Sequence, residues 1–402
     1  MCKSCPVVDW ALGLSSFGVP TNRKVTDEMG EYVLWYDQYD KSHAPVVGGK
    51  NASLGEMTLA GLPVPPGFAV TIDAYQEIWN HPGLGEGVNQ LLASIDHDAY
   101  GANQKIAAEI RQRIEAVPVP ARVAEEIARA YRTLGDHCGM VDVPVAVRSS
   151  ATAEDLPDAS FAGQQDTFLW ICGEDSVVEH VQKCWSSLFT DRAIAYRHMK
   201  GYLHQSISMS VGVQKMVDPI VAGVAFTLNP TNGDRSQIAI DASWGLGEAV
   251  VSGEVTPDNF LIDKVLREVV RRTVSTKTVE YRLTPSGTVE CCPVEAERQS
   301  VPCITDEELI AVAILARRAE KHYGRPQDVE WAIDRHLPRD QNVVMLQSRP
   351  ETVWSQKPRS PIAASAAGGG VRSVASTLMS PMHQSASSAN SGDGPSSTSG
   401  ST

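Results

Sequence analysis

The sequence contains no apolar run long enough to cross a membrane. Its longest apolar stretches, such as residues 220–228, fall well short of the ~20 residues that a membrane-spanning helix needs. The first six residues also lack the apolar core of a secretory signal. We therefore expect a soluble, cytoplasmic protein.

Basic residues are in the minority and do not cluster. The 402 residues include 35 lysines and arginines against 48 aspartates and glutamates, which gives a formal net charge of −13. No run rich in lysine or arginine stands out along the chain. Because nucleic acids are bound mainly by cations that contact their phosphates, nucleic acid is not expected as the main partner.

Cysteines are scattered too widely to form a disulfide framework in a chain of this length. Cys2 and Cys5 have the spacing of half a zinc site or of a redox pair, but no second C-x-x-C or H-x-x-x-H pattern completes four ligands. The plainer interpretation is an N-terminal segment with two exposed thiols. The eight cysteines lie at positions 2, 5, 138, 172, 184, 291, 292 and 303.

The composition divides the chain into four segments. Residues 1–44 are mixed and are interpreted as an N-terminal extension. Residues 45–205 alternate helical and strand patterns, and residues 206–354 are mainly strand patterns, so together they predict an α+β fold of two lobes. Residues 355–402 are rich in Ser, Ala, Gly and Pro and cannot offset the entropy of ordering, so they are expected to be a disordered tail.

Hydrophobic spacing and turn residues predict the individual elements. Helices are predicted over residues 51–59, 106–114, 123–134, 177–189 and 305–323. Strands are predicted over residues 67–71, 144–147, 167–171, 208–216, 221–228, 237–240, 260–263, 268–274, 328–334 and 342–348. The acidic residues that follow Thr305 suit the positive end of a helix dipole.

Phosphate chemistry needs backbone amides in a loop of small residues, cations for the oxygens, and an oxygen-bound divalent metal. The segment Val-Val-Gly-Gly-Lys at residues 46–50 would run as a short apolar strand into two glycines and a helix that begins near Lys50. It does not match the pattern G-x-x-x-x-G-K-S/T. A phosphate-facing Lys50 and a turn with a solvated lysine are about equally well supported by these residues.

A second segment, Val-Arg-Ser-Ser-Ala-Thr at residues 147–152, ends a buried strand with Arg148 and continues into a long loop of small residues. Only small side chains allow loop amides to approach phosphate oxygens closely. The alternative is an ordinary surface loop in which Arg148 pairs with Glu154 or Asp155.

A third set of residues lies in the last two predicted strands. Side chains alternate between the faces of a strand, so Glu330 lies opposite to the core residues around it, and Gln347 and Arg349 share one face. If the strands pair, Glu330 and Gln347 would hold Mg²⁺ and Arg349 would meet a terminal phosphate. The alternative is a solvent-facing salt bridge from Glu330 to Arg349, which would contribute little.

Four motifs occur in a fixed order along the chain. They are Gly-Gly-Lys at residues 48–50, Val-Arg-Ser-Ser-Ala-Thr at 147–152, Gly-Leu-Gly-Glu at 245–248 with Thr-Pro-Asp-Asn at 256–259, and Asp-Val-Glu-Trp at 328–331 with Gln-Ser-Arg-Pro at 347–350. In this order they resemble the nucleotide-binding part of the phosphoenolpyruvate synthase and pyruvate, phosphate dikinase family, which rifampicin phosphotransferases share. The resemblance covers about residues 45–354.

The resemblance implies an ATP-grasp fold, in which two α+β lobes hold ATP and Mg²⁺ between them. In this family Lys50, Arg148 and Arg349 would contact phosphates and act in catalysis by neutralising the charge on the transferred group. Glu330 and Gln347 would hold the metal. The full set of ATP contacts carried over to this chain is Lys50, Arg148, Gly163, Thr167, Gln214, Glu330, Gln347 and Arg349.

The sequence departs from the family in one important respect. Full-length members continue into a domain with a phosphorylated histidine in a Gly-Gly-x-Thr-Ser-His type of motif, and none of the ten histidines here has such a setting. The arrangement resembles phenylphosphate synthase, in which separate subunits carry the nucleotide-binding part and the histidine. A partner subunit with the histidine is therefore expected.

The expected reaction transfers the β,γ-diphosphoryl group of ATP to the partner histidine and releases AMP, followed by hydrolysis of the γ-phosphate. Phenol is the favoured final acceptor, and pyruvate is the alternative. A hypothesis of another class is a non-catalytic ATP-binding regulatory protein. The complete set of phosphate and metal ligands argues against that second hypothesis.

Overall fold

The structure, a computed structural model, describes residues 31–96, 104–151, 166–201, 207–251, 253–284 and 288–354. Residues 1–357 form one compact unit, and residues 358–402 form a second unit that lies wholly outside the described residues. The expected tail and the pair Cys2 and Cys5 are outside them as well. Within the described ranges the expectation of a mixed α+β architecture is confirmed.

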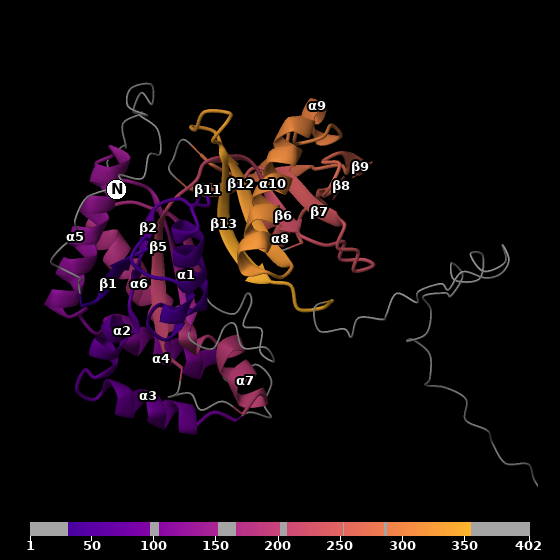
Figure 1. The fold of residues 1–402 in the computed structure, drawn as a ribbon. Coiled ribbons are helices and arrows are strands. Elements are labelled where there is room, and N and C mark those ends of the chain that lie inside the picture. The colour runs from indigo at the N-terminus through magenta and orange to yellow at the C-terminus, as the bar shows by residue number, and fades with distance from the viewer. Residues whose placement is uncertain are drawn as a thin grey trace, which may run out of the picture. The chain divides into compact units, whose positions relative to one another are not determined.

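The first of the two large sheets has five strands in the order β1-β2-β5-β3-β4, and all neighbouring strands are antiparallel (Figure 1). Its strands are β1 Val33–Trp35, β2 Gly67–Val70, β3 Val145–Ala151, β4 Thr167–Ile171 and β5 Met209–Lys215. The helices in this part of the chain are α1 Ala44–Leu59, α2 Ile72–Trp79, α3 Leu84–Ala93, α4 Gln104–Ala116, α5 Ala121–Cys138, α6 Glu174–Ser186 and α7 Asp191–Met199, with short 3₁₀ turns at Lys41–His43 and Ser187–Phe189.

One face of this sheet is covered by helices α2 to α6. Alternate strand residues such as Val147, Val211 and Val213 enter a single apolar core with residues of these helices. The stripe predicted for residues 123–134 forms the buried side of α5, with Val123 and Ile127 fully buried. The other face of the sheet, which carries the even-numbered residues of β3 and β5, faces α1 instead.

Helix α1 differs from the prediction at its start. The predicted apolar strand at residues 46–47 is wrong, because the chain is already helical from Ala44 and is interrupted at Gly48, where φ is +72°. Pro45 explains the early start, since proline fits the first turn of a helix where no hydrogen bond is lost. Glycine explains the interruption, since only a residue without Cβ adopts this angle at little cost.

The second large sheet has six antiparallel strands in the order β13-β12-β6-β7-β8-β9. Its strands are β6 Pro219–Phe226, β7 Gln237–Trp244, β8 Asp258–Asp263, β9 Val269–Thr273, β12 Gln327–Asp334 and β13 Val343–Pro350. A separate pair, β10 Val279–Leu283 and β11 Val289–Pro293, and the short helices α8 Glu248–Val251 and α9 Ala296–Gln299 complete this part.

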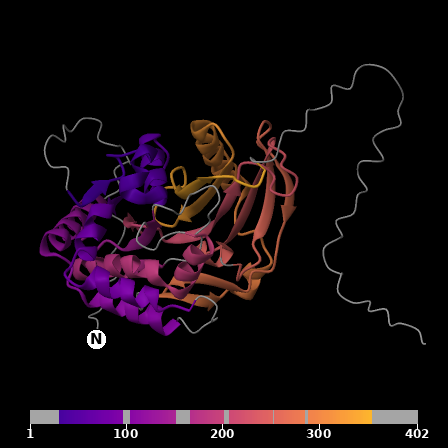
Figure 2. The same cartoon turned by 90° about the horizontal axis from the view of Figure 1, so that it is seen from below.

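Helix α10, Asp306–Tyr323, lies against one face of the second sheet (Figure 2). Thr305 begins it as predicted, because its side chain accepts the Glu308 amide while the Glu308 carboxylate accepts the Thr305 amide. Gly324 ends it in the left-handed conformation with φ of +67°. The core under α10 continues into α1, so α1 packs on both large sheets.

No helix in the parts of the chain that the structure describes is long and apolar enough to cross a membrane.

Candidate functional site

Arg148 lies in the middle of a row of residues that crosses the first sheet. In the β3 ladders it is paired with Gly212 of β5 on one side and with Thr167 of β4 on the other. Directly paired residues share a face of a sheet, so Thr167 lies beside Arg148 on the face that is not covered by α2 to α6. Gln214, two residues after Gly212, lies on the same face.

The Arg148 guanidinium reaches three acceptors of the second sheet. One terminal nitrogen, Nη2, donates to Gln347 Oε1 at 3.3 Å and to Glu330 Oε2 at 3.4 Å. The other, Nη1, donates to the Leu346 carbonyl oxygen at 3.4 Å. Residues 182 and 199 positions apart in the sequence therefore meet at one point. The expected pairing of Arg148 with Glu154 or Asp155 falls outside the described residues.

The second sheet presents its polar residues in two cross-strand pairs. Strands β12 and β13 pair as predicted, with Glu330 opposite Gln347 and Asp328 opposite Arg349. The two intervening core residues, Val329 and Trp331, are 1% exposed, so the alternation places all four polar side chains on the opposite face. The alternative salt bridge between Glu330 and Arg349 is not formed, because the Arg349 Nε lies 3.5 Å from Asp328 Oδ2.

Asp328 is a polar residue of this face that the sequence reasoning did not single out. Burial raises the pKa of its carboxyl to about 6, although the neighbouring Arg349 acts in the opposite direction. Its Oδ1 atom is buried and has no hydrogen-bond partner in the structure. The signal was available, because residues two apart on a strand share a face and Asp328 stands two positions before Glu330.

Lys50 comes to the same region from α1. Its Nζ lies 3.4 Å from the Ser149 carbonyl oxygen, next to Arg148 in β3. The turn around Gly48 makes this approach possible, because a Cβ there would lie 2.0 Å from the Ser150 carbonyl oxygen. The Asn51 amide also donates to Ser150 Oγ at 3.2 Å, which fixes the start of the second helical part of α1 on β3.

Gln214 is the most deeply buried of the predicted contacts, with 3% of its surface exposed. Its side-chain amide donates to the Pro65 carbonyl oxygen at 3.1 Å, so its orientation is set by the rigid turn before β2. Of the eight predicted contacts, seven lie on β3, β4, β5, β12, β13 or α1 around Arg148. The eighth, Gly163, lies outside the described residues.

The motif Thr-Pro-Asp-Asn has a structural explanation. Asp258 is fully buried, and its carboxylate accepts from Lys277 Nζ at 2.6 Å and from the amides of Ser275 and Cys303 at 2.9 Å. A buried carboxylate with a cation and two amides is a fully satisfied group. This arrangement ties together three parts of the chain, at residues 258, 275–277 and 303.

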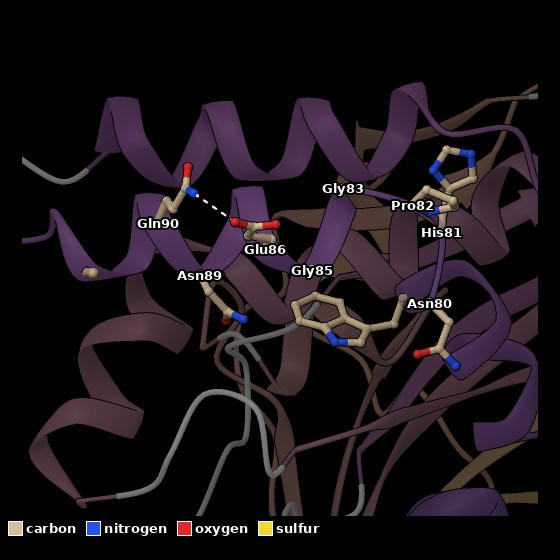
Figure 3. Close-up of a pocket in the computed structure, with 10 residues that line it drawn as sticks. Asn80, His81, Pro82, Gly83, Gly85, Glu86, Asn89 and Gln90 are labelled. Atoms are coloured by element: carbon tan, nitrogen blue, oxygen red, sulfur yellow. Dashed lines mark hydrogen bonds between the residues drawn. The ribbon is translucent and has the colours of Figure 1, made fainter.

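A surface hollow of the described residues lies elsewhere. It lies where α2 meets α3, has a volume of about 720 Å³ and is lined by Trp79, His81, Glu86 and Asn89 among others (Figure 3). Gln90 bonds to Glu86 within it, so these polar groups already satisfy each other. None of the predicted phosphate or metal contacts lines this hollow.

The chemistry of the donor set can be tested against a magnesium ion. Among the residues that the structure describes, no group of three or more His, Cys, Asp and Glu side chains is placed to hold a metal. Mg²⁺ does not require such a group, because it commonly takes one or two carboxylates and completes its shell with water and substrate phosphates. Glu330 and the adjacent Gln347 amide fit that requirement, and the unpartnered Asp328 oxygen lies on the same face.

Comparisons with known proteins identify the family of this chain. The family model described as "Pyruvate phosphate dikinase, AMP/ATP-binding domain" matches residues 44–367. A probable phosphoenolpyruvate synthase of Staphylothermus marinus is 46% identical over 346 residues, which cover 81% of this chain and 42% of that protein. The phosphoenolpyruvate synthase of Pyrococcus furiosus is 40% identical over 364 residues, covering 81% and 44%.

A third relative, a probable phosphoenolpyruvate synthase of Methanothermobacter thermautotrophicus, is 44% identical over 330 residues, covering 82% of this chain and 47% of that protein. The chain thus spans less than half the length of these curated relatives. By the matched family model and these identities, the chain belongs to the pyruvate phosphate dikinase family, and the match is to its AMP/ATP-binding domain.

Proposed function

We propose that this chain is the ATP-binding part of a phosphoenolpyruvate synthase-like phosphotransferase. The observation that carries the proposal is the contact of Arg148 with Glu330 and Gln347. It puts a cation of one sheet next to a carboxylate and an amide of the other, which is the donor set that a metal-bound triphosphate needs. We also propose that the two sheets with their helices form the two lobes of an ATP-grasp fold. The expected bounds, 45–205 and 206–354, need a correction, because β1 at Val33–Trp35 and β5 at Met209–Lys215 both belong to the first sheet.

The three cations would share the charge of the triphosphate. Lys50 would approach it from α1, Arg148 from the first sheet and Arg349 from the second. Because negative charge builds on the leaving oxygen as its bond to phosphorus breaks, preorganised cations would lower the barrier more than they improve binding of the ground state. Thr167 and Gly163 would line the loop over the phosphates, and Gln214 would lie near the adenine.

The contacts of Arg148 would change when ATP binds. The guanidinium, 22% exposed, now neutralises Glu330, whose side chain is 32% exposed. An incoming phosphate would take over the guanidinium, and Glu330 with Gln347 would become available for Mg²⁺. The metal would supply positive charge between the phosphates. The ion pair of Arg148 with Glu330 would thus be replaced by two others, Arg148 with a phosphate and Glu330 with Mg²⁺. Arg148 and Glu330 would each have a partner of opposite charge in both states.

The proposed reaction transfers a diphosphoryl group to histidine. An imidazole nitrogen would attack the β-phosphorus of ATP, the bond from the β-phosphorus to the α-phosphate oxygen would break, and AMP would leave. Water would then release the γ-phosphate as inorganic phosphate. Three of the described histidines, His43, His322 and His336, each lie against a carboxylate. We propose that a partner subunit carries the acceptor histidine.

The final acceptor is proposed on weaker grounds than the ATP chemistry. The names of the relatives favour pyruvate, because each of them is called a phosphoenolpyruvate synthase. Phenol, the acceptor favoured from the resemblance to phenylphosphate synthase, gains no support from these names. Both acceptors therefore belong in the same assay.

The proposal is tested by following the label of [β-³²P]ATP. The chain is mixed with Mg²⁺ and a separately purified histidine-bearing domain of a phosphoenolpyruvate synthase. We expect acid-labile, base-stable label on that domain and one AMP for each label transferred. Pyruvate or phenol is then added to the labelled domain to identify the acceptor. Binding of ATP without any AMP formation would contradict the transfer and would support the regulatory alternative.

A further inference from the structure

The second sheet has a hollow on the face opposite to Glu330. It has a volume of about 250 Å³. It lies between α10, the first residues of β7 and the last residues of β8. Two buried side chains, Ile238 and Ile262, form its floor. At the ~30 Å³ that one water molecule occupies in the liquid, this volume corresponds to about eight waters, which is the size of a small organic molecule.

The wall formed by α10 changes from apolar to basic along the helix. Ile310, Ala313 and Ile314 line one end of the hollow, and Arg317 and Lys321 line the other. These positions recur at spacings of three and four, so they form one stripe of the helix surface. Cations in the last turns of a helix also suit its dipole, so this stripe alone does not require a ligand.

The opposite wall is the turn between β8 and β9, and it supplies two further cations, Lys264 and Arg267. Lys264 is committed to the fold, because its Nζ lies within 2.9 Å of both Glu320 carboxylate oxygens and also donates to the Thr227 carbonyl oxygen. The Arg267 side chain is exposed and makes no hydrogen bond or ion pair within the described residues.

Arg267 also has an unusual backbone conformation. Its φ is +58°, and Trp170 is the one other non-glycine residue with a positive φ among those that the structure describes. The turn is closed by the Arg267 amide, which donates to the Asp263 carbonyl oxygen at 2.9 Å. Glycine would adopt this angle without strain, so the turn itself gives no reason for an arginine here.

The charges around the hollow are unbalanced. Five cations line it, namely Lys264, Arg267, Arg317, Arg318 and Lys321, and the single carboxylate that lines it is Asp263. Lys264 is neutralised by Glu320, and Arg317 and Arg318 donate to the carbonyl oxygens of Lys264 and Gly61, so the excess rests on Arg267 and Lys321 with these two arginines. The Asp263 carboxylate is occupied, because it accepts the amides of Val265 and Leu266 at 2.8 Å, which also lowers its pKa. A concave surface of one charge attracts ions of the opposite sign.

We propose that this hollow binds a small organic anion with an apolar body. The anionic group, a phosphate or a carboxylate, contacts Arg267 and Lys321. The apolar body lies on Ile310 and Ile314. The site is separate from the ATP site, because α10 and the floor residues lie on the opposite face of the second sheet from Glu330.

The test measures binding of hexyl phosphate by isothermal titration calorimetry, with inorganic phosphate as the anion that lacks an apolar body. We expect hexyl phosphate to bind at least tenfold more tightly than phosphate. Arg267→Gly is the decisive variant. It removes the cation and relieves the backbone, so we expect at least tenfold weaker binding together with an unchanged or higher melting temperature. Arg267→Lys, which keeps the charge, should retain most of the affinity.

Two controls separate this site from others. Arg339→Ala removes an exposed arginine from the β12–β13 turn and should leave binding unchanged. Lys50→Ala should also leave it unchanged, whereas loss of hexyl phosphate binding in Lys50→Ala would place the ligand in the ATP site and overturn the proposal. Equal affinity for wild type and Arg267→Gly, or no binding at millimolar hexyl phosphate, would overturn it as well. None of these outcomes depends on phosphotransfer activity.

Discussion

The two large sheets contribute to the proposed ATP site in different ways. The first sheet positions its residues by close packing: Gln214 is 3% exposed and bonded to Pro65, and Gly48 touches the backbone of β3. The second sheet positions its residues by strand register, and its side chains remain accessible, with Arg349 54% exposed. In the first sheet the proposed contact Gln214 is therefore also a buried residue, whereas Thr167 is exposed.

From this difference we expect that substitutions at the first sheet change both stability and ligand binding. Substitutions of accessible side chains on the second sheet should change ligand binding alone. A substitution that disturbs a packed backbone changes both the free energy of unfolding and the position of the side chains that depend on it. A substitution of an accessible side chain on a regular strand removes a contact to the ligand and little else.

The largest expected effect is on the second sheet. Arg349→Ala should lower phosphotransfer by about 10³-fold, because it removes a cation from the developing charge. The free energy of unfolding should change by only about 1 kcal/mol, since the Arg349 side chain is 54% exposed, although its partner Asp328 is 16% exposed. Initial rates and urea unfolding measure the two quantities, and Arg339→Ala is the matched control. A large loss of stability would show that this side of the site is not separable.

The next largest effect is expected at Gly48 of α1, where the helix contacts β3 of the first sheet. Gly48→Ala should destabilise the protein by about 2–5 kcal/mol, because a Cβ would lie 2.0 Å from the Ser150 carbonyl oxygen at a φ of +72°. ATP affinity should fall in parallel, since Lys50 follows two residues later. Gly61→Ala is the control: φ there is +67° but no atom lies within 4 Å, so about 1 kcal/mol is expected. Equal effects of both changes would refute the role of the contact with β3.

A smaller effect is expected for Glu330, a proposed ligand of Mg²⁺. Glu330→Gln should raise the Mg²⁺ concentration needed for half-maximal ATP binding at least tenfold, because a charged oxygen ligand becomes neutral. The fold should be retained, since the carboxylate is partly exposed. Titration of Mg²⁺ at fixed ATP, with the exposed Glu297→Gln as control, provides the measurement. An unchanged magnesium dependence would remove Glu330 from the set of metal ligands.

The smallest expected effect concerns the Tyr36 hydroxyl, a buried group without a hydrogen-bond partner. The Tyr36 hydroxyl is buried on the Arg148 face of the first sheet, and it has no hydrogen-bond partner in the structure. Burial raises the pKa of Tyr36, and the nearby Arg148 opposes the shift. Tyr36→Phe should therefore leave stability equal or up to about 1 kcal/mol higher. If calorimetry instead shows weaker ATP binding, the hydroxyl contacts the nucleotide.

Much of the fold was predictable where the residue pattern was strong. The stripes of α5 and α10 and the alternation in β12 and β13 are local signals, and the structure has an element at each of these places. The strand predicted at residues 46–47 failed because two valines also fit a helix that begins at a proline. The short pair β10 and β11 and the glycine-containing helix α3 gave no pattern that exceeds chance.

The candidate site was predictable in its residue types and not in its contacts. Alternation placed Glu330, Gln347 and Arg349 on one face, and that placement is found. It did not indicate that Arg349 would pair with Asp328 or that Arg148 would reach Glu330 and Gln347. These pairings depend on register and on the approach of two sheets, which no local pattern encodes.

The sequence by itself determined the elements, the faces of the strands and the kinds of donor that each face carries. These properties follow from side-chain size, charge and a repeat of two or 3.6 residues. The tertiary structure alone decided which donors meet. A cation from residue 148 and a carboxylate from residue 330 come within 3.4 Å because α1 packs on both sheets. Contacts between distant residues are set by the packing of the whole core, in which every element constrains the others.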